Sequence, residues 1–111
     1  MVGQKSSYFS SSIAICIADE FYRKAIDAYD RAEFVNAHGY SAKALKAKPK
    51  HKGALEIERL LSERAKQLYE EGYILEDLNP EKALEKWKEI VRTCPPDSEY
   101  YSKAQSRIAN Y

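Results

Sequence analysis

The chain has 111 residues, which is enough for one domain whose core does not depend on metal ions or disulfides. Its 18 Lys and Arg residues nearly balance 17 Asp and Glu residues, so the overall charge attracts neither nucleic acid nor an anionic membrane. Cys16 and Cys94 have no CxxC motif and no His at ligand spacing, and we expect two thiols and no metal or other cofactor. The longest apolar run, Ile13 to Ala18, is shorter than the about 20 residues of a membrane span, so we expect no membrane insertion and a cytoplasmic location.

Residues 1–11 are rich in serine and are predicted to be a linker, or a remnant of an added sequence, before a domain at residues 12–111. The domain is therefore expected to be one part of a larger multidomain protein. Apolar positions at helical spacing predict a first helix from about residue 12 to residue 32. It carries two apolar stripes, one through Phe21, Ala25 and Ala28 and the other through Tyr22, Ile26 and Tyr29. We expect the first stripe to be buried and the second to be partly exposed along a groove.

A second and a third helix are predicted at residues 34–47 and 52–77. Pro49 ends the second helix, because proline cannot continue a helix. In the third, the apolar stripe stays in phase from Ala54 to Leu75, which predicts one continuous helix of roughly 26 residues, about 39 Å long, without a turn near Ser62. Gly72 within this helix is explained best by a close helix crossing.

A fourth helix is predicted to start at Asn79-Pro80-Glu81, where Asn can cap free amides and Pro fits the first turn. It runs to about Thr93, and Trp87 is predicted to anchor it against the third helix. Cys94-Pro95-Pro96 ends it, and a fifth helix follows a cap at Asp97 or Ser98. The predicted fold is therefore all-α, with about five helices in antiparallel hairpins and an extended third helix.

The sequence contains one pattern twice, 46 residues apart: Ala37, Ala44 and Pro49, then Ala83, Ile90 and Pro95. In each copy a small residue is followed by an inward position and then by a proline that ends the helix. Two similar units at this spacing indicate repeated helix pairs, in which small residues let the helix backbones approach each other.

These residues resemble the tetratricopeptide repeat, whose second helix carries an Ala-x3-Phe pattern and whose repeat closes with proline. The pair Ala83 and Trp87 fills that pattern. In the first copy Lys24, Ala28 and Ser41 stand where the family has Leu, Tyr and Phe. The family repeats every 34 residues, so about 12 extra residues fall in the third helix, and HEAT and armadillo repeats remain structural alternatives. The sequence segments 68–73, 79–83 and 94–101 also resemble the helical repeat tails of bacterial multidomain signalling and envelope-assembly proteins.

The nine tyrosines exceed what a core of this size requires, and tyrosine suits interfaces. The resemblance places the tyrosine stripe of the first helix on the concave, ligand-facing side of the repeat. Apolar residues of the third helix then lie opposite this stripe. The predicted partner-binding residues are Tyr22, Ile26, Tyr29, Leu68, Gly72 and Leu75, and plain core packing of the same residues is the alternative. The same resemblance argues against a clamp for acidic peptide C-termini, because the required Lys, Asn and Arg positions hold other residues.

The sequence favours a non-enzymatic interaction module, a scaffold or adaptor that binds a peptide or helix of a partner protein. His38 and His51 have no acidic or nucleophilic partner at a motif spacing, so catalysis is not expected. A homodimerisation domain is the alternative. Nucleic-acid binding through the basic corner Lys43–Lys52 is less favoured, because helix-dipole complementarity explains those lysines and no aromatic residue is interleaved with them.

Overall fold

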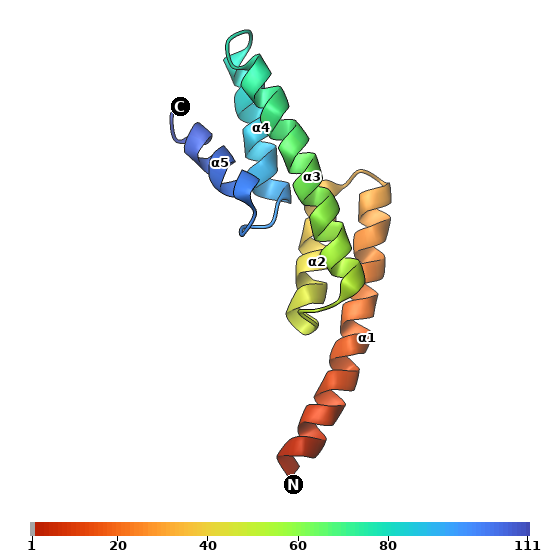
Figure 1. The fold of residues 1–111 in the computed structure, drawn as a ribbon. Helices are drawn as coiled ribbons and strands as arrows, with labels where there is room; N and C mark the ends of the chain where they lie inside the picture. The colour runs from red at the N-terminus through yellow and green to blue at the C-terminus, as the bar shows by residue number, and fades with distance from the viewer. Residues whose placement is uncertain (1) are drawn as a thin grey trace. The chain divides into compact units, whose positions relative to one another are not determined.

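The computed structural model describes the backbone of residues 2–111 and the side chains of residues 12–111. Over this range the chain is all-α, as predicted, with five helices and no strand (Figure 1): α1 (Val2–Asp30), α2 (Phe34–Ala47), α3 (Lys52–Leu75), α4 (Pro80–Thr93) and α5 (Glu99–Ile108). The chain divides into two compact units within α3. Unit 1 ends at Ile57 and unit 2 runs from Glu58 to Tyr111.

The helix boundaries follow the sequence signals closely, with one exception. Both α2 and α4 have the predicted bounds, and α3 is unbroken past Ser62, ending at Leu75 rather than at Asp77. The exception is α1, which begins at Val2 instead of near Ser12. Serine lowers helix propensity only modestly and residues 2–11 contain no proline, so the helix continues through them. Their role as a linker stays a prediction.

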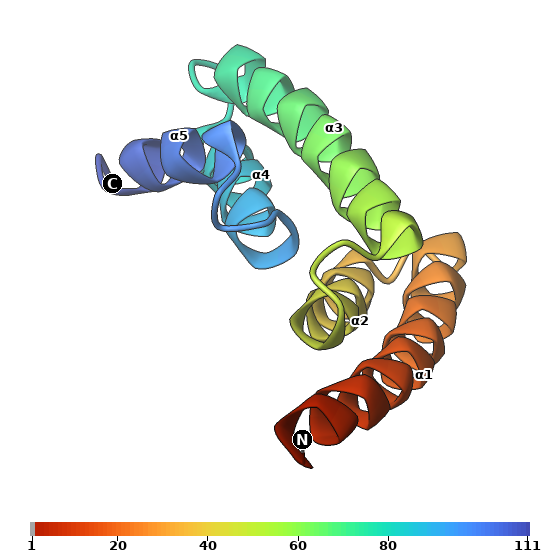
Figure 2. The same ribbon diagram turned by 60° about the horizontal axis from the view of Figure 1, so that its bottom comes forward.

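Small residues build the core of unit 1, where α1 and α2 lie side by side and antiparallel (Figure 2). Most of the buried residues are small and come from all three helices: Ala18, Ala25 and Ala28 of α1, Ala37, Ser41 and Ala44 of α2, and Ala54 of α3, with Ile57 of α3 as the larger buried aliphatic residue. Small side chains let the backbones approach closely, but they bury little apolar area. The larger aromatic side chains on α1 and α2 are therefore only half-buried.

The turn that sets α2 antiparallel to α1 is a Schellman-type cap with alanine in the left-handed position. Ala32 has φ of 61°, its N–H donates to the carbonyl of Tyr29 (3.0 Å), and the N–H of Glu33 donates to the carbonyl of Ala28 (2.8 Å). Glycine is the usual residue at this position because a Cβ makes left-handed backbone unfavourable. Two capping hydrogen bonds offset that cost and end α1 next to the start of α2.

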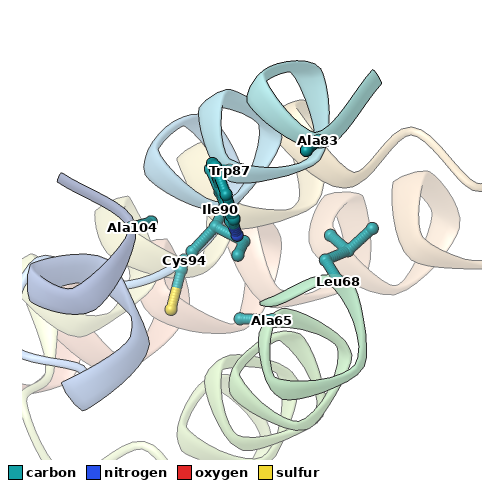
Figure 3. Packing of buried hydrophobic residues seen from close by; sticks show 7 residues of the cluster. All are labelled: Ala65, Leu68, Ala83, Trp87, Ile90, Cys94 and Ala104. Atoms are coloured by element: carbon teal, nitrogen blue, oxygen red, sulfur yellow. The ribbon is translucent and has the colours of Figure 1, made fainter. Parts of the chain in front are cut away.

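Unit 2 packs around Trp87, which has no exposed surface. The prediction that Trp87 anchors the fourth helix in the core is thus confirmed. Figure 3 shows its indole pointing from α4 toward α3, among a cluster contributed by the helices of this unit: Ala65, Leu68, Ala83, Ile90, Cys94 and Ala104. Tyr69 and Tyr111 flank the indole, with ring centroids 6.5 and 6.2 Å away. This core contains more large side chains than the core of unit 1, where Ile57 is the large buried aliphatic residue.

The 46-residue period of the sequence is also a period of the structure. Both α2 and α4 contain 14 residues, and their buried positions correspond: Ala37 with Ala83, Ser41 with Trp87, and Ala44 with Ile90. The two units differ at the middle position, where a serine stands in one and a tryptophan in the other. The same helix frame therefore supports two cores of very different volume.

Gly72 makes room for the indole on α3. A Cβ at this position would lie 2.5 Å from Nε1 of Trp87, which is closer than such atoms approach in folded proteins. The predicted close helix crossing at Gly72 is thus confirmed. A Cβ at Gly39 on α2, by contrast, would meet nothing within 4 Å.

We expect Gly72→Ala and Gly39→Ala to change stability in opposite directions. Gly72→Ala forces the buried indole to shift and should lower the free energy of unfolding by about 1–3 kcal/mol. Gly39→Ala should raise it by up to about 1 kcal/mol, because alanine loses less entropy than glycine in a helix. Urea denaturation of the two variants beside the unmodified protein measures both effects. Equal effects of the two changes would contradict the packing of Trp87 on Gly72.

Candidate functional site

The predicted tyrosine stripe on α1 is half-buried, as expected, but its tyrosines pack within their own unit. The ring of Tyr22 lies 5.0 Å from the His51 ring and covers Gly53, whose added Cβ would overlap it. Tyr29 makes an edge-to-face contact with Phe34 at 5.4 Å, and Ile26 is half-buried between them in sequence. Internal packing covers much of the surface of these rings. Their role in binding a partner stays a prediction.

The second predicted set belongs to the core of unit 2, which corrects its assignment to a binding groove. Leu68 is 5% exposed, Gly72 is buried under Trp87, and Leu75 is half-buried against the same cluster. Helical periodicity identifies the side of α3 that is apolar, but it does not tell whether a helix of the same chain covers it. Here α4 covers it, so Leu68 and Gly72 leave no open apolar surface and Leu75 leaves only part of its side chain exposed.

His51 has an acidic partner that the sequence analysis missed. Its Nδ1 accepts a hydrogen bond from the N–H of Ala54 (3.1 Å), so the neutral ring carries its proton on Nε2, which donates to Oδ1 of Asp19 (2.8 Å). Asp19 lies on α1, 32 residues away, and no local spacing reveals the pair. His51 is the N-cap of α3, since the N–H of Leu55 also donates to its carbonyl (3.0 Å). Both ring nitrogens are engaged, so neither offers a free lone pair for proton transfer.

Replacing His51 should show that capping is its main contribution. We expect His51→Ala to lower the free energy of unfolding by about 1–2 kcal/mol, because the amide of Ala54 loses its acceptor. His51→Asn should recover much of this loss, since asparagine is also a strong N-cap. Urea denaturation of both variants gives the comparison, and an equal loss in both would assign the stability to the contact with Asp19 instead.

Just before the first buried residue among its described side chains, α1 exposes apolar residues. The exposed fractions of Ile13, Ile15 and Ile17 are 59, 42 and 43%, and Cys16 between them is also exposed. Within the described side chains of α1, burial begins only at Ala18. The reason is length: α1 has 29 residues and α2 has 14, and α1 continues past the end of its neighbour (Figure 1). A helix segment that is apolar on several sides is usually covered.

Along one side of α1 this exposed surface forms a continuous face, which we call the α1 apolar face and which consists of Ile13, Cys16, Ile17 and Phe21. A shallow hollow of about 370 Å³ lies on it, lined by Cys16, Ile17, Glu20 and Phe21. Phe21 is half-buried, not buried as predicted, because the small side chains of α2 do not cover its ring completely. The face therefore combines apolar side chains with a partly open aromatic ring.

Two lysines border this face at the end nearer α2. Phe21 stacks with Tyr40 at a centroid distance of 6.4 Å, and the ammonium groups of Lys24 and Lys43 both lie 5.6–5.9 Å from these two rings. We call these four residues the lysine–aromatic cluster. Cation–π attraction holds the ammonium groups in place, and no carboxylate forms an ion pair with either lysine within the described residues.

The sequence contains a signal for this cluster that the sequence analysis did not use. Phe21 precedes Lys24 by three residues, and Tyr40 precedes Lys43 by the same interval. Residues three apart lie next to each other on a helix surface, so each lysine can reach the ring on its own helix. In the sequence, Lys24 stands out only as a departure from a family pattern, and Lys43 belongs to the basic corner that helix-dipole complementarity explains.

The two cysteines are free thiols in different surroundings. Cys16 is exposed on α1, and Cys94 is buried in the core of unit 2, where burial raises the pKa of its thiol. Weaker effects of nearby hydroxyls, led by Ser98, act in the opposite direction on the same pKa. In the part of the chain whose side chains are described, no three potential metal ligands come together.

The thiols should therefore react at very different rates with Ellman's reagent. At neutral pH we expect Cys16 to react rapidly and Cys94 to react only when the protein unfolds, because burial blocks access and disfavours the thiolate. Absorbance should show one fast equivalent in native buffer and a second in denaturant. Cys16→Ser should remove the fast phase, and a fast phase that survives this change would place Cys94 at the surface.

Unit 2 exposes apolar residues as well, but its rings are tied to charged groups. Arg107 lies over the rings of Tyr73 (4.8 Å) and Trp87 (5.7 Å), and its Nη1 is 3.5 Å from Oε1 of Glu76. The hydroxyl of Tyr111 donates to the same carboxylate (3.1 Å). This network fixes α5 against the end of α3 and leaves Ile74 and Leu78 as the exposed aliphatic residues there.

Comparison with protein-family models, with curated proteins and with solved structures finds no match to this chain. Within the described residues, no helix has an apolar stretch long enough to cross a bilayer.

Proposed function

We propose that this chain is a non-enzymatic protein-interaction module that binds a helix or peptide of a partner through the α1 apolar face. The observation that carries the proposal is the exposure of Ile13, Ile15 and Ile17 within five residues of one helix. Single exposed apolar residues are common, whereas a cluster of this kind is typical of interaction surfaces. Covering the exposed part of such a side chain removes further apolar surface from water and so favours association.

The wider architecture supports the same role. Repeated helix pairs without a catalytic constellation are typical of scaffold and adaptor domains, and the resemblance to tetratricopeptide repeats suggests a domain of this type. His51 is engaged through both ring nitrogens, which supports a non-enzymatic role. This assignment differs from the sequence prediction in its surface, because the residues predicted on α3 are packed inside unit 2.

Self-association is the second candidate, and one observation favours it. Ile13 and Ile15 lie on different sides of α1, and both are exposed. Since the segment is apolar on more than one side, a second copy of α1 is a suitable cover. Nucleic-acid binding by the basic corner has less support, since His51 points to Asp19 and Lys43 lies over two aromatic rings.

A double variant tests the proposed surface. We expect Ile13→Ser with Ile17→Ser to abolish capture of a partner from an extract of the source cells, because the apolar contact is lost. Serine and isoleucine have similar helix propensities and both positions are exposed, so the thermal unfolding midpoint should remain within a few degrees. Affinity capture followed by mass spectrometry measures the first result and circular dichroism the second.

The matched control is Ile74→Ser with Leu78→Ser, which removes the same kind of exposed side chain from unit 2. Capture should survive this change. If both double variants lose the partner equally, or neither does, the α1 apolar face is not the binding surface. Light scattering on the same samples separates the second candidate: a dimer that the α1 variant disrupts would establish self-association.

A further inference from the structure

We infer that the partner is an acidic amphipathic helix, with its apolar stripe on the α1 apolar face and its carboxylates at the lysine–aromatic cluster. The inference rests on the proposed function and adds the chemistry of the partner. It requires two properties of one surface. The first is an apolar stripe with the length and spacing of a helix, and the second is positive charge at one end that forms no ion pair with a carboxylate among the described side chains.

The apolar half of the site has helical geometry. Ile13, Ile17 and Phe21 follow one another at intervals of four residues, which on α1 places them in a row about 12 Å long. A second helix laid beside α1 presents its own side chains at the same intervals, so three of its apolar residues can interdigitate with this row. The hollow between Cys16, Ile17 and Phe21 accepts one side chain of this kind.

The charged half of the site lies at one end of that row. Lys24 and Lys43 approach the same two rings, so two positive charges are held near each other. Some other cations among the described residues form ion pairs instead: Arg31 pairs with Asp27 (3.3 Å) and Lys86 with Glu71 (3.1 Å). A carboxylate placed between Lys24 and Lys43 completes both ion pairs and reduces their mutual repulsion.

Glu20 determines which way an acidic helix fits. It also lines the hollow, four residues before Lys24 on the same side of α1. A carboxylate next to Glu20 is repelled, and one next to Lys24 and Lys43 is attracted. The partner's acidic residues therefore belong at the end of its helix that lies over the lysine–aromatic cluster, with neutral or basic residues over Glu20.

A second copy of this chain lacks that charge pattern. In a symmetric antiparallel pair of α1 helices centred on Ile17, Lys24 of one copy lies opposite residue 10 of the other, which is a serine. The two pairs of lysines then remain without a carboxylate. Charge complementarity favours an acidic partner helix over self-association.

The test uses the full chain and three labelled peptides that share one helix-favouring sequence with leucines at intervals of four residues. They differ only at two positions beyond one end of the apolar stripe, which hold Glu, Gln or Lys. In fluorescence anisotropy at low salt, the Glu peptide should bind about five- to tenfold more tightly than the Gln peptide, and the Lys peptide more weakly still. Salt should reduce this difference.

Substitution assigns the preference to the cluster. Lys24→Gln with Lys43→Gln should abolish the preference for Glu, while Lys82→Gln with Lys88→Gln on α4 should leave it unchanged, because these lysines are equally exposed but lie in unit 2. Ile13→Ser with Ile17→Ser should weaken the binding of all three peptides to the same extent. That result reports the apolar face independently of charge.

Several outcomes would overturn the inference. Equal affinity for the three peptides, with loss on substitution of the isoleucines, would refute the acidic partner and leave the proposed function standing. Absence of binding by every peptide would refute the inference. If the unmodified protein is then a dimer that Ile13→Ser with Ile17→Ser disrupts, the α1 apolar face belongs to the contact with a second copy of the chain. Binding to phosphatidylserine vesicles in place of the peptides would assign it to a lipid surface. Peptide affinities that the isoleucine changes leave intact would refute both proposals.

Discussion

A helix is buried only over the length that its neighbours reach, and this constraint determines the surface of unit 1. At 1.5 Å per residue, the 29 residues of α1 extend about 43 Å and the 14 residues of α2 about 21 Å. Burial among the described side chains of α1 accordingly starts at Ala18. The isoleucines before that point are as apolar as core residues, yet no helix of unit 1 covers them. Everything we propose about function follows from this difference in length.

The 46-residue repeat shows how one residue changes the use of a helix pair. In unit 2, Trp87 fills the space between helices and needs Gly72 to give it room. In unit 1, the equivalent position is Ser41, and the core is closed by alanines. Because that core has little volume, Phe21 and Tyr40 stay at its edge, where their faces are accessible to lysines. The smaller core thus generates the lysine–aromatic cluster.

Much of the fold was predictable from the sequence, because helix ends depend on local chemistry. The signals at Pro49, Asn79-Pro80 and Cys94-Pro95 located the ends of α2 and α4, and the phase of the apolar residues predicted an unbroken α3. The site was less predictable. Periodicity shows that Leu68 faces an apolar environment, but only the packed structure shows that α4 supplies it. The contact between Asp19 and His51 joins residues with no sequence relation and was missed for that reason.

Anchoring at one end of α1 supports the recognition that we propose for its other end. The contacts of Tyr29 with Phe34, Tyr22 with His51, and His51 with Asp19 all fix the C-terminal half of α1 within unit 1. Continuous helix from this anchored half holds Ile13, Ile17 and Phe21 in one row before any partner arrives. A partner then has less conformational entropy to remove, and more of the apolar contact energy contributes to affinity. The half-buried Tyr22 and Tyr29 therefore support α1 through contacts within unit 1, and their role in binding a partner stays a prediction.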